Sequence, residues 1–124
     1  MSGPTPLGRR RVVVTGMGTV TPLANDVAGT WAALVAGRSG VRPITSFDPS
    51  RLTSRIAGEV QDLDASGVLD RKELRRTDRF TQFALVAARE AMAQAGLPAR
   101  LEGAQAEETG TLVASGMGGT GTLV

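Results

Sequence analysis

The sequence predicts an α/β fold, because β-branched runs, glycine-rich turns and helical stretches follow one another along the chain. Residues 11–16 (RVVVTG) form an apolar run without polar alternation, which is typical of a strand buried on both faces of a parallel sheet. A loop at residues 17–25 follows, and the next segment has helical periodicity. The order strand, loop and helix opens an α/β unit.

The first helix is expected to begin after a cap at Asn25 or Asp26 and to stop at Gly37. Residues 37–55 are rich in turn signals and predict a loop. Residues 55–60 (RIAGEV) predict a short strand.

The strongest helical pattern follows Thr77 or Asp78 and ends at residues 96–98 (GLP). Its surface is apolar or small nearly all round, so we expect cover on more than one side. Residues 111–115 (TLVAS) predict a second buried strand, before a glycine-rich turn at residues 116–121. A parallel sheet needs helices on both faces, and these elements are too few to supply them. The chain is therefore expected to be part of a larger fold.

Composition excludes several kinds of chemistry. The 124 residues are 41% apolar and 3% aromatic, which fits one domain or part of one. They include neither Cys nor His, so the chain holds no disulfide, thiolate nucleophile, Cys/His zinc site or imidazole base. Residues 1–8 (MSGPTPLG) predict a disordered leader.

No apolar run approaches the roughly 20 residues that span a bilayer. The apolar stretch at residues 12–14 is too short for the core of a signal peptide. We therefore expect a cytoplasmic protein without a membrane partner.

A basic segment precedes the strongest helix. Asp70 and Glu73 have the spacing of a capping box, which predicts a helical turn over residues 71–76. If the turn continues into the next helix, its cations share one face: Arg71, Lys72, Arg75, Arg76 and Arg79. That face is either solvated or a dock for an acidic partner. Aromatic residues for base stacking are absent among these charges, which disfavours single-stranded nucleic acid.

Two glycine motifs invite a nucleotide-binding interpretation. The pair Gly16 and Gly18 lacks the third glycine of a dinucleotide fingerprint. Gly116, Gly118 and Gly121 match the G-x-G-x-x-G spacing after a predicted strand, but the required acidic residue about 20 positions later is missing. A tight backbone turn is the favoured interpretation.

Other polar motifs are weaker. Ser115 does not lie in the G-x-S-x-G of a nucleophile elbow. Two close carboxylate pairs are candidates for cation binding or acid–base work, although surface positions explain them as well: Asp62 with Asp64, and Glu107 with Glu108. We expect no metal site and no cofactor.

Four blocks of the sequence resemble, in family order, the amino-terminal part of a β-ketoacyl-acyl carrier protein synthase, most closely the synthase II type of bacterial fatty-acid synthesis. The blocks are residues 9–26, 30–41, 69–92 and 109–124. The resemblance implies a thiolase-like fold built from two related α-β-α-β-α layered halves, incomplete in this chain, and a homodimer. Residues 9–124 are then the N-terminal segment of the synthase domain.

The resemblance also implies a reaction. Members of the family move an acyl group from carrier protein to a Cys and condense it with decarboxylating malonyl-carrier protein, giving a β-ketoacyl thioester two carbons longer. Two His stabilise the enolate charge of the thioester oxygen. The family places all three residues after the SGMGG block, so we expect residues 1–124 alone to be inactive.

Two groups of site residues follow from the resemblance. Met117, between Gly116 and Gly118, is expected to border the acyl-chain pocket, where a flexible thioether suits an alkyl tunnel. The basic run of the family contacts the acidic acyl carrier protein, and it matches Arg71, Lys72, Arg75 and Arg76.

Alternative functions remain open at this point. A polyketide-type ketosynthase shares the first and third blocks. A noncatalytic carrier-protein-binding module would use the same basic run. A nucleotide-binding fragment would use residues 116–121.

Overall fold

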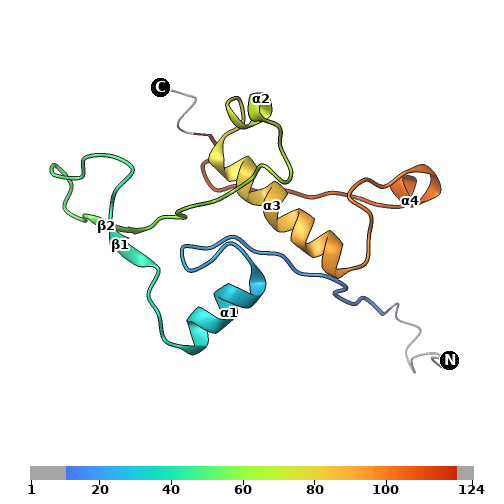
Figure 1. The fold of residues 1–124 in the computed structure, drawn as a ribbon, viewed down its shortest axis with the longest axis horizontal. Helices are drawn as coiled ribbons and strands as arrows, with labels where there is room; N and C mark the ends of the chain where they lie inside the picture. The colour runs from blue at the N-terminus through green and yellow to red at the C-terminus, as the bar shows by residue number, and fades with distance from the viewer. Residues whose placement is uncertain (1–10, 120–124) are drawn as a thin grey trace.

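The computed structural model describes residues 11–119 and combines helices with one small sheet, as expected for an α/β chain (Figure 1). The predicted leader at residues 1–8 and Gly121 lie outside the described residues. The elements in order are α1 (Val27–Val35), β1 (Val41–Pro43), β2 (Ile56–Gly58), α2 (Arg71–Leu74), α3 (Arg79–Gln94) and α4 (Gly103–Glu107).

Helix α1 begins and ends where its local signals predict. The carboxylate of Asp26 accepts a hydrogen bond from the backbone N–H of Gly29 at 2.5 Å, so Asp26 rather than Asn25 is the N-cap. Gly37 follows the helix with a φ of +65°, the left-handed conformation that ends helices. Ala33 on this helix is buried.

Strands β1 and β2 pair antiparallel, with Val41 opposite Gly58 and Pro43 opposite Ile56. The prediction of a strand within residues 55–60 is confirmed, whereas β1 was expected to be loop. Proline has no backbone N–H to donate and is found in sheets mainly on edge strands. Pro43 therefore lowers the strand preference of residues 41–43 in the sequence. Pairing with β2 determines its conformation.

Helix α3 lies centrally in the view of Figure 1, with the other elements around it. It begins after Asp78 and ends before Gly96, whose φ is +70°. The backbone N–H of Leu97 donates to the carbonyl of Met92 at 2.9 Å, which closes the last turn. Both predicted ends are confirmed.

The two predicted buried strands are absent from the described chain. Residues 11–16 and 111–115 pair with no other segment between residues 11 and 119. Val12 is 94% exposed and Leu112 is 96% exposed. The apolar pattern expresses a preference for burial, but a strand also needs the hydrogen-bonding edge of a second strand.

Segment 11–19 runs instead beside α3 (Figure 1). The backbone N–H of Met17 donates to Oε1 of Gln94 at 2.6 Å, and that of Thr19 donates to Oε2 of Glu90 at 2.9 Å. A Cβ on Gly18 would lie 1.8 Å from the carbonyl oxygen of Ala87. Only glycine permits so close an approach of the two backbones.

Glu90 also connects this segment to α1. Its Oε1 accepts the backbone N–H of Val27, the first residue of α1, at 2.8 Å. One half-buried carboxylate of α3 therefore holds both segment 11–19 and the start of α1, whose bonded residues lie 71 and 63 positions earlier in the sequence. Charge-assisted hydrogen bonds of this type are about twice as strong as neutral ones.

The core is small among the described residues. Ala33 and Ala65 are the buried apolar side chains of residues 11–119, at 5% and 3% exposure, while large apolar residues such as Trp31, Val35 and Ile56 are exposed. Helices of this part of the chain are all too short or too polar to cross a bilayer. Segment 11–19 covers one side of α3, and the segment around Gly67 lies beside another, where its carbonyl accepts a hydrogen bond from Arg89.

Candidate functional site

Helix α2 carries two of the predicted basic residues, Arg71 and Lys72, and Arg75 and Arg76 follow directly after it. A complete capping box forms the N-terminus of the helix. Oδ1 of Asp70 accepts the backbone N–H groups of Lys72 and Glu73, each at 2.7 Å. Oε2 of Glu73 accepts the backbone N–H of Asp70 at 2.8 Å. The capping box is confirmed, although the α-helix ends at Leu74 rather than Arg76.

Four cationic side chains surround one hollow of about 430 Å³ on this part of the surface. We call them the cationic cluster: Arg71, Lys72, Arg75 and Arg76. All four residues are exposed. None of their side chains forms an ion pair or hydrogen bond with another residue of segment 11–119.

Two acids at the start of this basic segment do not neutralise the cluster by direct pairing. The carboxylates of Asp70 and Glu73 instead receive backbone N–H groups at the start of α2. Unpaired, exposed cations that share a hollow create a positive potential, which attracts an acidic partner and raises its association rate. The geometry therefore suits the docking of an acidic surface.

Arg79 does not belong to the cluster, which corrects the expected continuous face. Helix α2 ends at Leu74 and α3 starts at Arg79, so the i, i+4 spacing does not continue between them. Arg79 Nη2 donates to the carbonyl of Val60 at 2.9 Å, and its guanidinium lies 5.2 Å from the ring centroid of Phe83. These contacts draw Arg79 toward the segment after β2.

The glycine turn near the end of the described chain has the tight geometry expected of it. Gly118 has a φ of +65°, and its backbone N–H donates to Oγ of Ser115 at 3.0 Å. Met117 is 83% exposed. Its expected role in an acyl pocket stays a prediction, and the third glycine of the motif, Gly121, is outside the described residues.

Neither predicted carboxylate pair gathers a third potential metal ligand among the described residues. Within residues 11–119 no three acidic side chains come together as metal ligands. The side chain and backbone of Ser66 lower the pKa of Asp64, because their hydrogen bonds favour the ionised form. This carboxylate serves a local turn.

Glu59 is a carboxylate that the sequence patterns missed. Its two oxygens accept the hydroxyl and backbone N–H of both Thr45 and Ser46, at 2.5 to 3.1 Å. The Ser46 hydroxyl and then the Thr45 groups lower the pKa of Glu59 to about 2. Glu59 thereby fixes the start of the loop that leaves β1.

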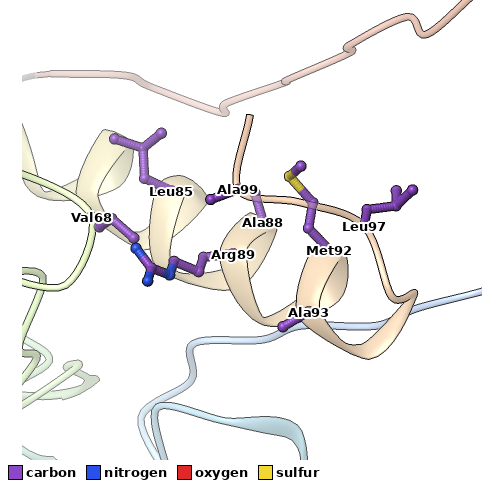
Figure 2. Close-up of a pocket in the computed structure, with 8 residues that line it drawn as sticks. All are labelled: Val68, Leu85, Ala88, Arg89, Met92, Ala93, Leu97 and Ala99. Carbon is purple, nitrogen blue, oxygen red and sulfur yellow. The ribbon is translucent and has the colours of Figure 1, made fainter. Parts of the chain in front are cut away.

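An apolar groove of about 460 Å³ lies on another side of α3 (Figure 2). Leu85, Ala88 and Met92 of α3 line it together with Val68 and Leu97. Arg89 borders the groove and donates a hydrogen bond to the carbonyl of Gly67. The mostly aliphatic lining of this groove contrasts with the cationic cluster, so the chain presents two chemically different surfaces.

Comparison with known proteins gives a consistent result. The family model for the beta-ketoacyl synthase N-terminal domain matches residues 9–124. The 3-oxoacyl-[acyl-carrier-protein] synthase 2 of Coxiella burnetii is 49% identical over 111 residues, covering 90% of this chain and 26% of that protein. The synthase of the same name from Synechocystis is 44% identical over 117 residues, covering 94% of this chain and 28% of the relative.

A solved structure is similar as well. The ishigamide ketosynthase/chain length factor aligns with a TM-score of 0.65 and 41% identity, covering 73% of this chain and 22% of that one. This chain spans about a quarter of the length of the curated relatives it matches.

Proposed function

The chain belongs to the β-ketoacyl synthase family, as its N-terminal domain with a thiolase-like fold, and from this we propose that the protein is a 3-oxoacyl-[acyl-carrier-protein] synthase of fatty-acid elongation. It would condense an enzyme-bound acyl group with malonyl-carrier protein and release CO₂. The nucleophilic Cys and the two His of such chemistry would come from polypeptide outside residues 1–124, which contain neither residue type. Residues 9–124 alone would then be inactive.

The cationic cluster supplies the contribution of this segment: docking of an acidic acyl carrier protein. The observation that supports it is the convergence of four exposed cations on one hollow, where none of them forms an ion pair with residues 11–119. Arginine suits such an interface because its planar guanidinium binds carboxylates through two parallel hydrogen bonds.

Charge reversal in the full-length protein tests this docking. Arg75→Glu should weaken binding of acyl carrier protein about tenfold or more, because attraction between Arg75 and the acidic partner is replaced by repulsion between two negative charges. Arg51→Glu is the matched control, since Arg51 is exposed in the loop between β1 and β2 and the change in net charge is the same. Adding salt to the unmutated protein should also weaken binding, through screening. Equal affinities of the two variants would refute the docking surface.

Lys72→Glu and Arg76→Glu extend the test across the hollow. If the cluster acts as a unit, each change alone should weaken binding and reduce its salt dependence, and combining both with Arg75→Glu should abolish binding. Condensation measured with acyl- and malonyl-carrier proteins should fall through a higher KM for carrier protein. A drop in kcat at saturating carrier protein would instead indicate damage to the catalytic centre.

Met117 would border the acyl-chain pocket in the complete protein, with Gly116 and Gly118 setting its backbone. Two features support this: Gly118 in a left-handed conformation holds the turn, and the Met117 side chain projects free of the described chain. We further propose that the protein works as a cytoplasmic homodimer that needs no cofactor.

The similarity to the ishigamide ketosynthase/chain length factor supports a second candidate, a polyketide ketosynthase. The two candidates differ in product. A synthase of fatty-acid elongation should accept saturated acyl-carrier proteins and extend them by one unit per turnover. Repeated condensation that gives poly-β-keto products, detected by mass spectrometry of carrier-bound species, would favour the polyketide function.

A further inference from the structure

The cationic cluster lies on helix α2 and on the two residues that follow it, a segment too short to hold its own orientation. Helix α2 comprises four residues, whereas isolated helices shorter than about 12 residues are marginal in water. The capping box satisfies its N-terminal N–H groups, but the last carbonyls of a helix also need partners. The contacts at the C-terminus of α2 therefore decide where the cluster points.

Gln82 of α3 provides two of these contacts, in addition to the hydroxyl of Thr77, which donates to the carbonyl of Glu73 at 2.6 Å. Its Nε2 donates to the carbonyl oxygen of Thr77 at 2.8 Å and to that of Leu74 at 3.3 Å. Leu74 is the last residue of α2 and Thr77 lies just before α3, so one half-buried amide holds both ends of the connection. The two carbonyls bracket Arg75 and Arg76, half of the cationic cluster.

We infer that Gln82 is a positioning residue for carrier-protein docking: it fixes the peptide units on either side of Arg75 and Arg76, and so aligns the cluster before the partner arrives. This inference rests on the docking function proposed above. A cluster that is ordered in advance loses less conformational freedom on binding, which slows dissociation of the complex. In this role Gln82 acts through the peptide units beside Arg75 and Arg76, not through a contact of its own with the partner.

Gln82→Met tests this role in the full-length protein. Methionine has a similar length but no donor, and the net charge is unchanged, so electrostatic steering and the association rate should stay the same. The dissociation rate of acyl carrier protein, measured by surface plasmon resonance, should rise about three- to tenfold. Gln82→Asn keeps the amide on a side chain too short to reach both carbonyls and should have a smaller effect in the same direction, which preserves the test if Gln82→Met does not fold.

Gln94→Met is the matched control. It removes a hydrogen bond of similar kind at the opposite end of the same helix, to the backbone N–H of Met17 at 2.6 Å. It should lower the unfolding temperature while leaving the dissociation rate of acyl carrier protein unchanged. If Gln82→Met and Gln94→Met have equal dissociation rates, the role of Gln82 is purely structural and the inference is wrong.

The Arg75→Glu variant separates the two proposals. Suppose that Arg75→Glu weakens binding, while acyl carrier protein dissociates from both Gln82 variants as slowly as from the unmutated protein. The docking function is then supported and the positioning role of Gln82 is wrong. If Arg75→Glu leaves binding unchanged, the docking function is wrong and the role of Gln82 falls with it.

Discussion

Gly18→Ala is the sharpest test of the fold, because it adds one methyl group where two backbones meet. The new Cβ would lie 1.8 Å from the carbonyl oxygen of Ala87 and 2.8 Å from the backbone nitrogen of Ala91. Both are backbone atoms within α3, so neither can rotate away. Real Cβ contacts stay beyond 3.0 Å, so segment 11–19 must move by roughly 1.2 Å.

The magnitude follows from what that movement breaks. Thr19, the next residue, donates its backbone N–H to Glu90 at 2.9 Å, and a shift of this size lengthens the contact past hydrogen-bond range. A hydrogen bond to a charged group contributes about 1.5–3 kcal/mol, and overpacking adds about 1–3 kcal/mol. Because the chain can relax, we expect a loss of about 2–4 kcal/mol in the free energy of unfolding.

Urea denaturation of the full-length protein measures this loss. Gly67→Ala is the control, since a Cβ there meets no atom within 4 Å and the backbone φ is not left-handed. It should change the free energy of unfolding by at most about 0.5–1 kcal/mol, through the unfolded chain. If Gly18→Ala and Gly67→Ala unfold at the same urea concentration, segment 11–19 does not pack on α3.

Three further changes test other parts of the structure. Because the pKa of Glu59 is about 2 in the folded protein against an ordinary 4.5, its stabilising effect is complete above pH 4.5 and is lost as the pH falls toward 2. Glu59→Gln should therefore make the unfolding temperature less dependent on pH between 4.5 and 2. If the unfolding temperature of the variant falls as steeply as that of the unmutated protein over this range, the hydrogen bonds of Glu59 do not stabilise the fold. Glu90→Gln replaces one of two accepting oxygens by a donor, and should lower the free energy of unfolding by about 1–3 kcal/mol, whereas Glu107→Gln on exposed α4 should have no effect in the same denaturation experiment. Met117→Phe in the complete enzyme should reduce turnover of long acyl chains and spare short ones, and an unchanged chain-length profile would exclude Met117 from the pocket.

Helix ends were predictable because their signals are local. A cap residue bonds N–H groups two or three positions away, so Asp26 and the capping box of Asp70 with Glu73 are visible in the sequence alone. Gly37 and Gly96 end α1 and α3 for the same reason.

Strands were less predictable because every hydrogen bond of a sheet ladder has its second partner on another segment. The valines of residues 12–14 have the composition of a buried strand, but the described chain offers them no pairing edge. The case of β1 is the opposite. Its Pro43 lowers the local preference for strand, but β2 supplies the neighbouring strand with which it pairs.

In the candidate site, too, local signals were predictable and contacts between segments were not. Spacing alone grouped Arg79 with the cationic cluster, because i, i+4 arithmetic assumes an unbroken helix. The break between Leu74 and Arg79 sends Arg79 to Val60 instead. The amide contacts of Gln82 that hold this break join residues by position in space, and the sequence carries no signal for them.

The spacing of the first glycine pair has a geometric explanation that a nucleotide motif does not provide. Two residues of extended chain advance about 6.6 Å, and four residues of α-helix advance about 6.0 Å. Gly16 accordingly meets Ala91 and Ala95, while Gly18 meets Ala87 and Ala91, one helical turn earlier. A G-x-G segment therefore stays in register with a helix whose alanines repeat every four residues. A one-residue insertion between the glycines would place a side chain against the backbone of α3 and disrupt the contact.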